Sequence, residues 1–211
     1  MKKSRKINHW EEIYKSGKVW GSLLEEIHPL FKKFVKQTNS KIKYVLDIGC
    51  GTGSYLKFLK DEGFKISGVD SSKTAIANAK RLLGENSNVK RANMFNFNIP
   101  RNKYDLIISV SSIHHGTKKQ IKNLINKIYN SLSLNGKIFI TIPDVKSSQE
   151  WNTFKNSKEI RMGEFKPFKG PERGLIHSFY SKKEIEGLFS KFKNLRLDID
   201  KTGRWIVTGK K

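Results

Sequence analysis

Asp47 and Asp70 each stand at the end of a short apolar segment, and the glycines Gly49, Gly51 and Gly53 follow the first of them at alternate positions. Glycine adopts backbone angles that other residues avoid, and it lets a ligand lie directly against the main chain. An amphipathic stretch begins right after the glycines, so a helix N-terminus would direct its free N–H groups at the same place. This order predicts a strand, a tight turn and a helix that hold a nucleoside-sized ligand.

The positions of the two acids indicate the charge of that ligand. Asp70 ends a second predicted strand, where a carboxylate can accept hydrogen bonds from both hydroxyls of a ribose. Asp47 lies inside the turn, where a pyrophosphate would be repelled, so it favours a sulfonium or an amino-acid cation and is expected to orient the amino group. The alternative for each acid is a helix cap. For the helix near residue 73, Ser71 or Ser72 can serve as that cap instead of Asp70.

The elements that position these residues form a regular series. Strands are expected near 42–48, 64–69, 88–91, 104–110 and 136–142, with helices near 53–62, 73–83 and 118–132. Two closing strands, 194–200 and 204–208, follow a helix that Ser181 and Glu184 begin as a capping pair. The series predicts a doubly wound α/β fold, with a mostly parallel seven-stranded sheet, helices on both faces and an antiparallel strand at the closing end.

Two segments flank this unit. Residues 1–40 are expected to form a helical cover, and residues 41–211 the main domain. Within that domain, residues 143–180 combine three prolines with several aromatic side chains and are expected to be an irregular, lid-like insertion over the ligand crevice.

Composition narrows the class of protein. The chain of 211 residues contains no apolar run near the ~20 residues that span a bilayer, and its basic N-terminus lacks the apolar segment of a signal peptide. The single cysteine, Cys50, cannot form an internal disulfide or a cysteine-based zinc site, so we expect a cytoplasmic protein without a metal. The net charge of +23 has two interpretations, a polyanionic substrate such as RNA or the lysine-rich surface that an AT-rich genome produces.

Four motifs, at residues 45–54, 68–72, 104–115 and 134–141, resemble those of the class I S-adenosylmethionine-dependent methyltransferases in order and spacing. The resemblance implies S-adenosyl-L-methionine as the cofactor. Combined with the arguments above, it implies a cofactor site formed by Asp47, Gly49, Gly51, Gly53, Asp70, Ser71, Asn93, Met94 and Ser111. Asn93 departs from the family, which often has a carboxylate there, but an amide oxygen can still accept from the adenine amino group.

Three residues are candidates for work on the acceptor. His114 follows the fourth strand and is a candidate general base, with a structural histidine as the alternative. Tyr14, with Trp20, resembles the aromatic cover of small-molecule methyltransferases, and His177 lies in a segment expected near the acceptor. Methyl transfer needs mainly alignment of the nucleophile, because the sulfonium is already activated, so a dedicated base is optional.

Three functions remain open. The first is a methyltransferase for a small-molecule acceptor, acting as a monomer or homodimer. The second is a transfer-RNA methyltransferase, because residues 113–115 and 203–207 resemble enzymes that methylate modified wobble uridines and the flanks are basic. The third is a non-catalytic protein that binds the cofactor or a partner. Enzymes that methylate a protein or a base amide typically have an Asn-Pro-Pro-Tyr-like clamp after the fourth strand. This chain has Ser109-Val110-Ser111-Ser112 there, which argues against those acceptors.

Overall fold

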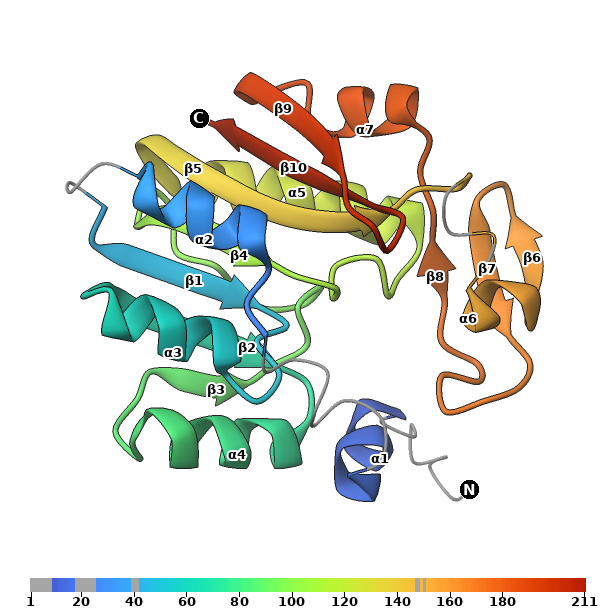
Figure 1. Cartoon of the computed structure of the whole chain (residues 1–211), viewed down its shortest axis with the longest axis horizontal. Coiled ribbons are helices and arrows are strands. Elements are labelled where there is room, and N and C mark those ends of the chain that lie inside the picture. Colours follow the sequence, from blue (N-terminus) through green and yellow to red (C-terminus); the bar gives the residue numbers. More distant parts are fainter. Residues whose placement is uncertain (1–8, 18–25, 39–41, 147–148, 150) are drawn as a thin grey trace.

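A seven-stranded sheet forms the centre of the molecule, with the strand order β3-β2-β1-β4-β5-β10-β9 (Figure 1). The computed structural model describes residues 9–17, 26–38, 42–146, 149 and 151–211. The strands are β1 (Tyr44–Ile48), β2 (Lys65–Asp70), β3 (Val89–Arg91), β4 (Tyr104–Ser109), β5 (Leu132–Pro143), β9 (Lys193–Ile199) and β10 (Arg204–Lys210). The first five pair in parallel, and β10 runs antiparallel to β5 and β9. The sheet confirms the predicted α/β fold, and its order reverses between β1 and β4, where ligands of such folds bind.

Helices cover both faces because the side chains of the central strands alternate between two apolar clusters. Val45 and Leu106 join the cluster beneath α2 (Pro29–Lys36) and α3 (Ser54–Asp61). Leu46 and Ile107 point the other way, into the cluster beneath α5 (Lys118–Ser131) and α7 (Lys182–Leu188). The helix α4 (Lys73–Leu83) packs with α3 near β3. Within the described ranges, no helix has the length and apolar character needed to cross a membrane.

The N-terminal cover includes α1 (His9–Ser16), which docks on the start of α4. Glu11 accepts hydrogen bonds from Ser72 Oγ at 2.9 Å, Thr74 N at 3.1 Å and Thr74 Oγ1 at 2.8 Å. Burial would raise the pKa of Glu11, but the hydrogen bonds from Thr74 and Ser72 outweigh it and lower the pKa to about 2. Ser72 Oγ also accepts from Ala75 N at 3.0 Å, so Ser72 is the side-chain cap of α4.

The insertion is more regular than expected. It contains α6 (Asn152–Lys155) and a separate antiparallel sheet of β6 (Ser157–Arg161), β7 (Glu164–Pro167) and β8 (His177–Ser178), drawn in orange beside the main sheet (Figure 1). Phe154, Phe165 and Phe179 form its small core, with ring centroids 4.6 to 5.3 Å apart. The insertion is therefore an ordered subdomain, which corrects the prediction of an irregular segment.

Candidate functional site

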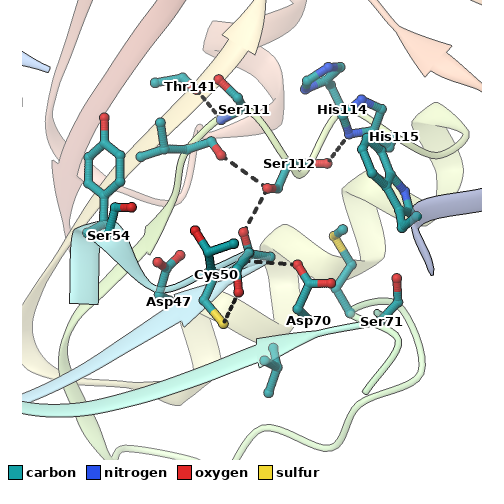
Figure 2. Close-up of a pocket in the computed structure, with 18 of the residues that line it drawn as sticks. Asp47, Cys50, Ser54, Asp70, Ser71, Ser111, Ser112, His114, His115 and Thr141 are labelled. Carbon is teal, nitrogen blue, oxygen red and sulfur yellow. Dashed lines mark hydrogen bonds between the residues drawn. The ribbon is translucent and has the colours of Figure 1, made fainter. Parts of the chain in front are cut away.

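A large cavity lies at the carboxyl ends of β1, β2 and β4, with a volume of about 1270 Å³ (Figure 2). It is the place where the switch in strand order predicts a ligand. The predicted site residues in its wall are Tyr14, Asp47, Gly49, Gly51, Asp70, Ser71, Asn93, Met94, Ser111, His114 and His177. Gly53 is not part of this wall. It is the N-cap of α3, with a φ of +91°, and a Cβ there would lie 3.2 Å from Ala79 Cβ, so packing accounts for this glycine.

The loops after β1 and β4 meet at Gly49. Its φ is +79°, and a Cβ at this position would lie 2.4 Å from the Cβ of Ser112. Ser112 Oγ donates a hydrogen bond to the Gly49 carbonyl at 2.9 Å, and Ser109 Oγ donates to the Ile48 carbonyl at 2.7 Å. The two loops are thus held together without space for a side chain at position 49.

The carboxyl groups of Asp47 and Asp70 face the same cavity (Figure 2). Asp70 accepts hydrogen bonds from Gly51 N at 3.0 Å and from Ser72 N at 2.9 Å, which fixes its orientation. Burial raises its pKa, and these amide hydrogen bonds oppose the increase. Asp47 is 3% exposed, and burial together with the neighbouring Asp70 raises its pKa to about 8. A cationic ligand beside these two carboxyl groups, one buried and one part-buried, would favour their ionised forms and so be favoured at this place.

The loop after β3 differs in detail from the prediction. Asn93 lies in the cavity wall with Met94, but its Oδ1 already accepts a hydrogen bond from Phe95 N at 2.9 Å. This local turn uses one of the two lone pairs that the amide oxygen offers. One lone pair of Asn93 Oδ1 is then left for the predicted bond to adenine.

Ser111 lies in the wall with a backbone conformation that is rare for a residue with a side chain. Its φ is +52°, and its N–H donates to Thr141 Oγ1 at 2.8 Å. Strained backbone of this kind is common at functional sites. This hydrogen bond to Thr141 of β5 helps to hold the strained loop that carries Ser112 and His114.

Two distant segments bring three histidines together. His114 and His115 come from the loop after β4, and His177 comes from β8. The ring centroid of His115 lies 3.9 Å from that of His114 and 4.7 Å from that of His177. The attachment of β8 explains this proximity, since Ser178 N donates to the His114 carbonyl at 2.9 Å and Ser178 Oγ to the Gly116 carbonyl at 2.6 Å.

Burial affects the protonation of two of these histidines. His114 and His177 are each 2% exposed. Burial, with His115 and His177 nearby, lowers the pKa of His114 well below its usual range. Burial and His115 lower the pKa of His177 to about 3, although Glu172 opposes the decrease. Both rings are neutral at pH 7, and a low pKa makes His114 a weak general base.

The sequence pattern did not reveal the histidine cluster as a set. It singled out His114 and His177 separately and assigned no role to His115 or Glu172. The adjacent His114-His115 pair was a visible signal, but its third member lies on a strand of two residues whose position no local pattern predicts.

The first helix closes the cavity from the N-terminal side. Trp10 packs edge-on against His115, with ring centroids 4.5 Å apart. Tyr14 is half-buried, and burial together with Asp70 raises the pKa of its hydroxyl, so it remains a hydrogen-bond donor. Trp20, the other expected cover residue, lies outside the described residues.

Comparisons with known sequences agree with this geometry. Residues 45–136 match a family described as a methyltransferase domain. An uncharacterized methyltransferase from Staphylococcus carnosus is 33% identical over 99 residues, which are 46% of this chain and 45% of that protein. Another, from Anoxybacillus flavithermus, is 27% identical over 136 residues, which are 63% of each chain. The chain thus spans less than two thirds of the length of these curated relatives.

Solved structures share the fold at low sequence identity. A protein from Pyrococcus horikoshii has a TM-score of 0.71 at 18% identity, with 96% of this chain and 93% of that chain covered. A SAM-dependent methyltransferase from Methanosarcina mazei has a TM-score of 0.68 at 18% identity, with 88% and 98% covered. A third, from Thermotoga maritima, described as a possible histamine N-methyltransferase, has a TM-score of 0.69 at 18% identity, with 96% and 98% covered.

The matched domain contains the glycine loop that begins at Gly49 and both carboxylates of the cavity, and the shared fold extends over nearly the whole chain. Residues 45–136 thus match a methyltransferase domain, and the chain shares its fold with solved SAM-dependent methyltransferases.

Proposed function

We propose that the protein transfers the methyl group of S-adenosyl-L-methionine to a small-molecule acceptor, by in-line displacement at an oxygen, nitrogen or sulfur atom. The observation that carries this proposal is the pairing of the buried Asp47 carboxyl with the part-buried Asp70 carboxyl beside the loop at Gly49. Asp70 is oriented to accept from the ribose hydroxyls. Because the pKa of Asp47 is raised to about 8, its carboxyl would ionise as the cationic amino group and sulfonium bind beside it.

The size and cover of the cavity support a small acceptor. Its volume of about 1270 Å³ exceeds the ~300–1,000 Å³ of a typical small-molecule site, so an acceptor can lie beside the cofactor. Trp10 of α1 and His177 of the insertion line its wall. Because His114 is a weak base, alignment of the acceptor with the methyl group would provide most of the rate.

The test is calorimetric titration with S-adenosylhomocysteine, S-adenosylmethionine and NAD. We expect binding of the first two only, and an affinity about 10- to 100-fold lower for Asp70→Asn, since a charge-assisted hydrogen bond contributes about 1.5–3 kcal/mol. The matched control is Asp61→Asn, which removes an exposed acid paired with Lys57 on α3. Unchanged affinity of a folded Asp70→Asn would refute the ribose assignment. If the wild type binds neither compound, the non-catalytic alternative is favoured.

A transfer-RNA acceptor is the second candidate, and the surface of the insertion favours it. Met162 and Phe168, on the insertion, are 84% and 51% exposed and lie near Arg161 and Lys169 in sequence, within a chain of net charge +23. Aromatic side chains among basic ones stack on exposed bases. If transfer RNA is the acceptor, the affinity for a transfer-RNA transcript, measured by fluorescence anisotropy, should decrease steeply as the salt concentration rises. Phe168→Ala should lower affinity, whereas the control Leu134→Ala, on another exposed apolar side chain, should not.

A further inference from the structure

The histidine cluster has a composition that methyl transfer does not require. Three of the five histidines of the chain, His114, His115 and His177, each present a ring nitrogen, and these nitrogens lie within 4.8 Å of one another. The carboxylate of Glu172 adjoins two of them, with Oε1 3.6 Å from His115 Nε2 and Oε2 3.7 Å from His177 Nε2. We propose that these four residues bind a divalent transition-metal ion, zinc(II) in the first place, on the acceptor side of the cavity.

The ring nitrogens are available as ligands. His115 Nδ1 lies 2.9 Å from the Ser112 carbonyl oxygen, so the proton belongs on Nδ1 and the lone pair on Nε2 faces the cluster. Metal-binding histidines typically donate their second N–H to such a carbonyl. His114 Nδ1 and His177 Nε2 are buried and lack a hydrogen-bond partner within the described part of the chain. Unpaired buried nitrogens are unfavourable, and a bound ion would satisfy both.

The arrangement suits zinc in ligand type and in shape. Zinc accepts imidazole nitrogens and carboxylate oxygens in a tetrahedral set, with Zn–N distances of about 2.0–2.1 Å and hence about 3.4 Å between ligand nitrogens. The present separations, up to 4.8 Å, require a modest inward rotation of the rings. The hydrogen bond from Ser178 N to the His114 carbonyl already joins the two segments that supply the histidines.

The position of the cluster in the cavity indicates that the ion would bind the methyl acceptor, and this step rests on the proposed methyl transfer. The cluster lines the same cavity as Asp47 and Asp70. A hydroxyl or thiol acceptor that joins the ion as a fifth ligand would become more acidic and release its proton to water. Its lone pair then forms the bond to the methyl carbon, the bond from that carbon to the sulfonium breaks, and S-adenosylhomocysteine leaves. The acceptor class is therefore an alcohol, phenol or thiol.

The experiment measures metal binding separately from catalysis. The full chain is purified without a histidine tag, stripped with a chelator and titrated with zinc(II), and the cobalt(II) form is examined by absorption spectroscopy. We expect one equivalent of zinc and a cobalt spectrum typical of four-coordination. His177→Ala should bind zinc at least ~100-fold more weakly, because loss of a direct ligand exceeds the 10- to 100-fold effect of outer residues. The control His28→Asn, which changes a cavity histidine paired with Asp200 at 3.7 Å, should bind like the wild type.

Three results would overturn the proposal: no stoichiometric zinc in the wild type, equal affinity in a folded His177→Ala, or an equal loss in His28→Asn. If His177→Ala does not fold, Glu172→Gln replaces it, and undiminished zinc affinity there removes Glu172 from the ligand set and refutes the four-residue site. Titration of the metal-free protein with S-adenosylhomocysteine keeps the two proposals distinct. Cofactor binding without zinc binding refutes only the metal site, and zinc binding without cofactor binding refutes only the proposed function.

Discussion

Replacement of Gly49 by alanine tests how the cavity is built. A Cβ at position 49 would lie 2.4 Å from Ser112 Cβ and 2.5 Å from Ser112 Oγ, in a backbone with a φ of +79°. The left-handed conformation costs about 1–2 kcal/mol and overpacking about 1–3 kcal/mol, so we expect a decrease in unfolding free energy of about 2–5 kcal/mol.

Two further variants separate the backbone and steric contributions. Gly63 has a φ of +86°, and a Cβ there would meet nothing within 4 Å, so Gly63→Ala reports the backbone cost alone. Ser112→Gly removes both clashing atoms but loses the hydrogen bonds to the Gly49 and Val110 carbonyls, at 2.9 and 3.1 Å, which costs about 1–2 kcal/mol. The double variant Gly49→Ala/Ser112→Gly should therefore be about 1–3 kcal/mol more stable than the sum of its single changes predicts.

The assay is urea unfolding of the wild type and the four variants, followed by circular dichroism and analysed with a common m-value. Two outcomes would refute the reasoning. One is a Gly49→Ala variant no less stable than Gly63→Ala. The other is additivity of the Gly49 and Ser112 changes within ~0.5 kcal/mol, the limit expected for independent sites.

Two other predictions concern charge. The folded pKa of Asp47 is raised from its ordinary 3.8 to about 8, so its contribution to stability is complete below pH 4 and is lost as the pH rises to 8. Asp47→Asn should remove this part of the pH dependence of the unfolding free energy in urea. An unchanged dependence on pH between 4 and 8 would contradict the assignment. Glu11→Ala should accelerate amide hydrogen exchange in α1, because Glu11 holds that helix to Ser72 and Thr74. The control is Glu12→Ala, which replaces an exposed neighbouring acid and should leave the exchange rates unchanged. Equal exchange in the two variants would argue against this docking.

Local patterns predicted the central elements closely, because their causes are local. The helix expected at 73–83 is α4 at Lys73–Leu83, since apolar periodicity and a serine cap define it. The strand expected at 42–48 is β1 at Tyr44–Ile48. The capping pair of Ser181 and Glu184 is confirmed at the start of α7. β5 begins earlier than expected, at Leu132, because α5 passes directly into it.

The insertion and the histidine cluster depend on contacts that are distant in the sequence. β7 has four residues and β8 two, too few for a period-two pattern, and they pair across an intervening loop. His177 reaches His114 only because Ser178 attaches β8 to the loop after β4. The turn that occupies Asn93 Oδ1 likewise became visible only in the three-dimensional structure. Sequence therefore predicted most of the residues that line the cavity near Asp47 and Asp70, but not the cluster that His114 and His177 form with His115 and Glu172.

The strand order also has a consequence for synthesis on the ribosome. β10 pairs with β5 from Arg204 opposite Pro143 to Lys210 opposite Lys137, so one edge of β5 lacks its neighbour until β10 has been made. At ~5–20 residues per second, the ~60 intervening residues leave that apolar edge unpaired for about 3–12 s. Unpaired edges recruit other strands. The nascent chain should thus be most prone to aggregation, and most dependent on chaperones, while the insertion is being translated.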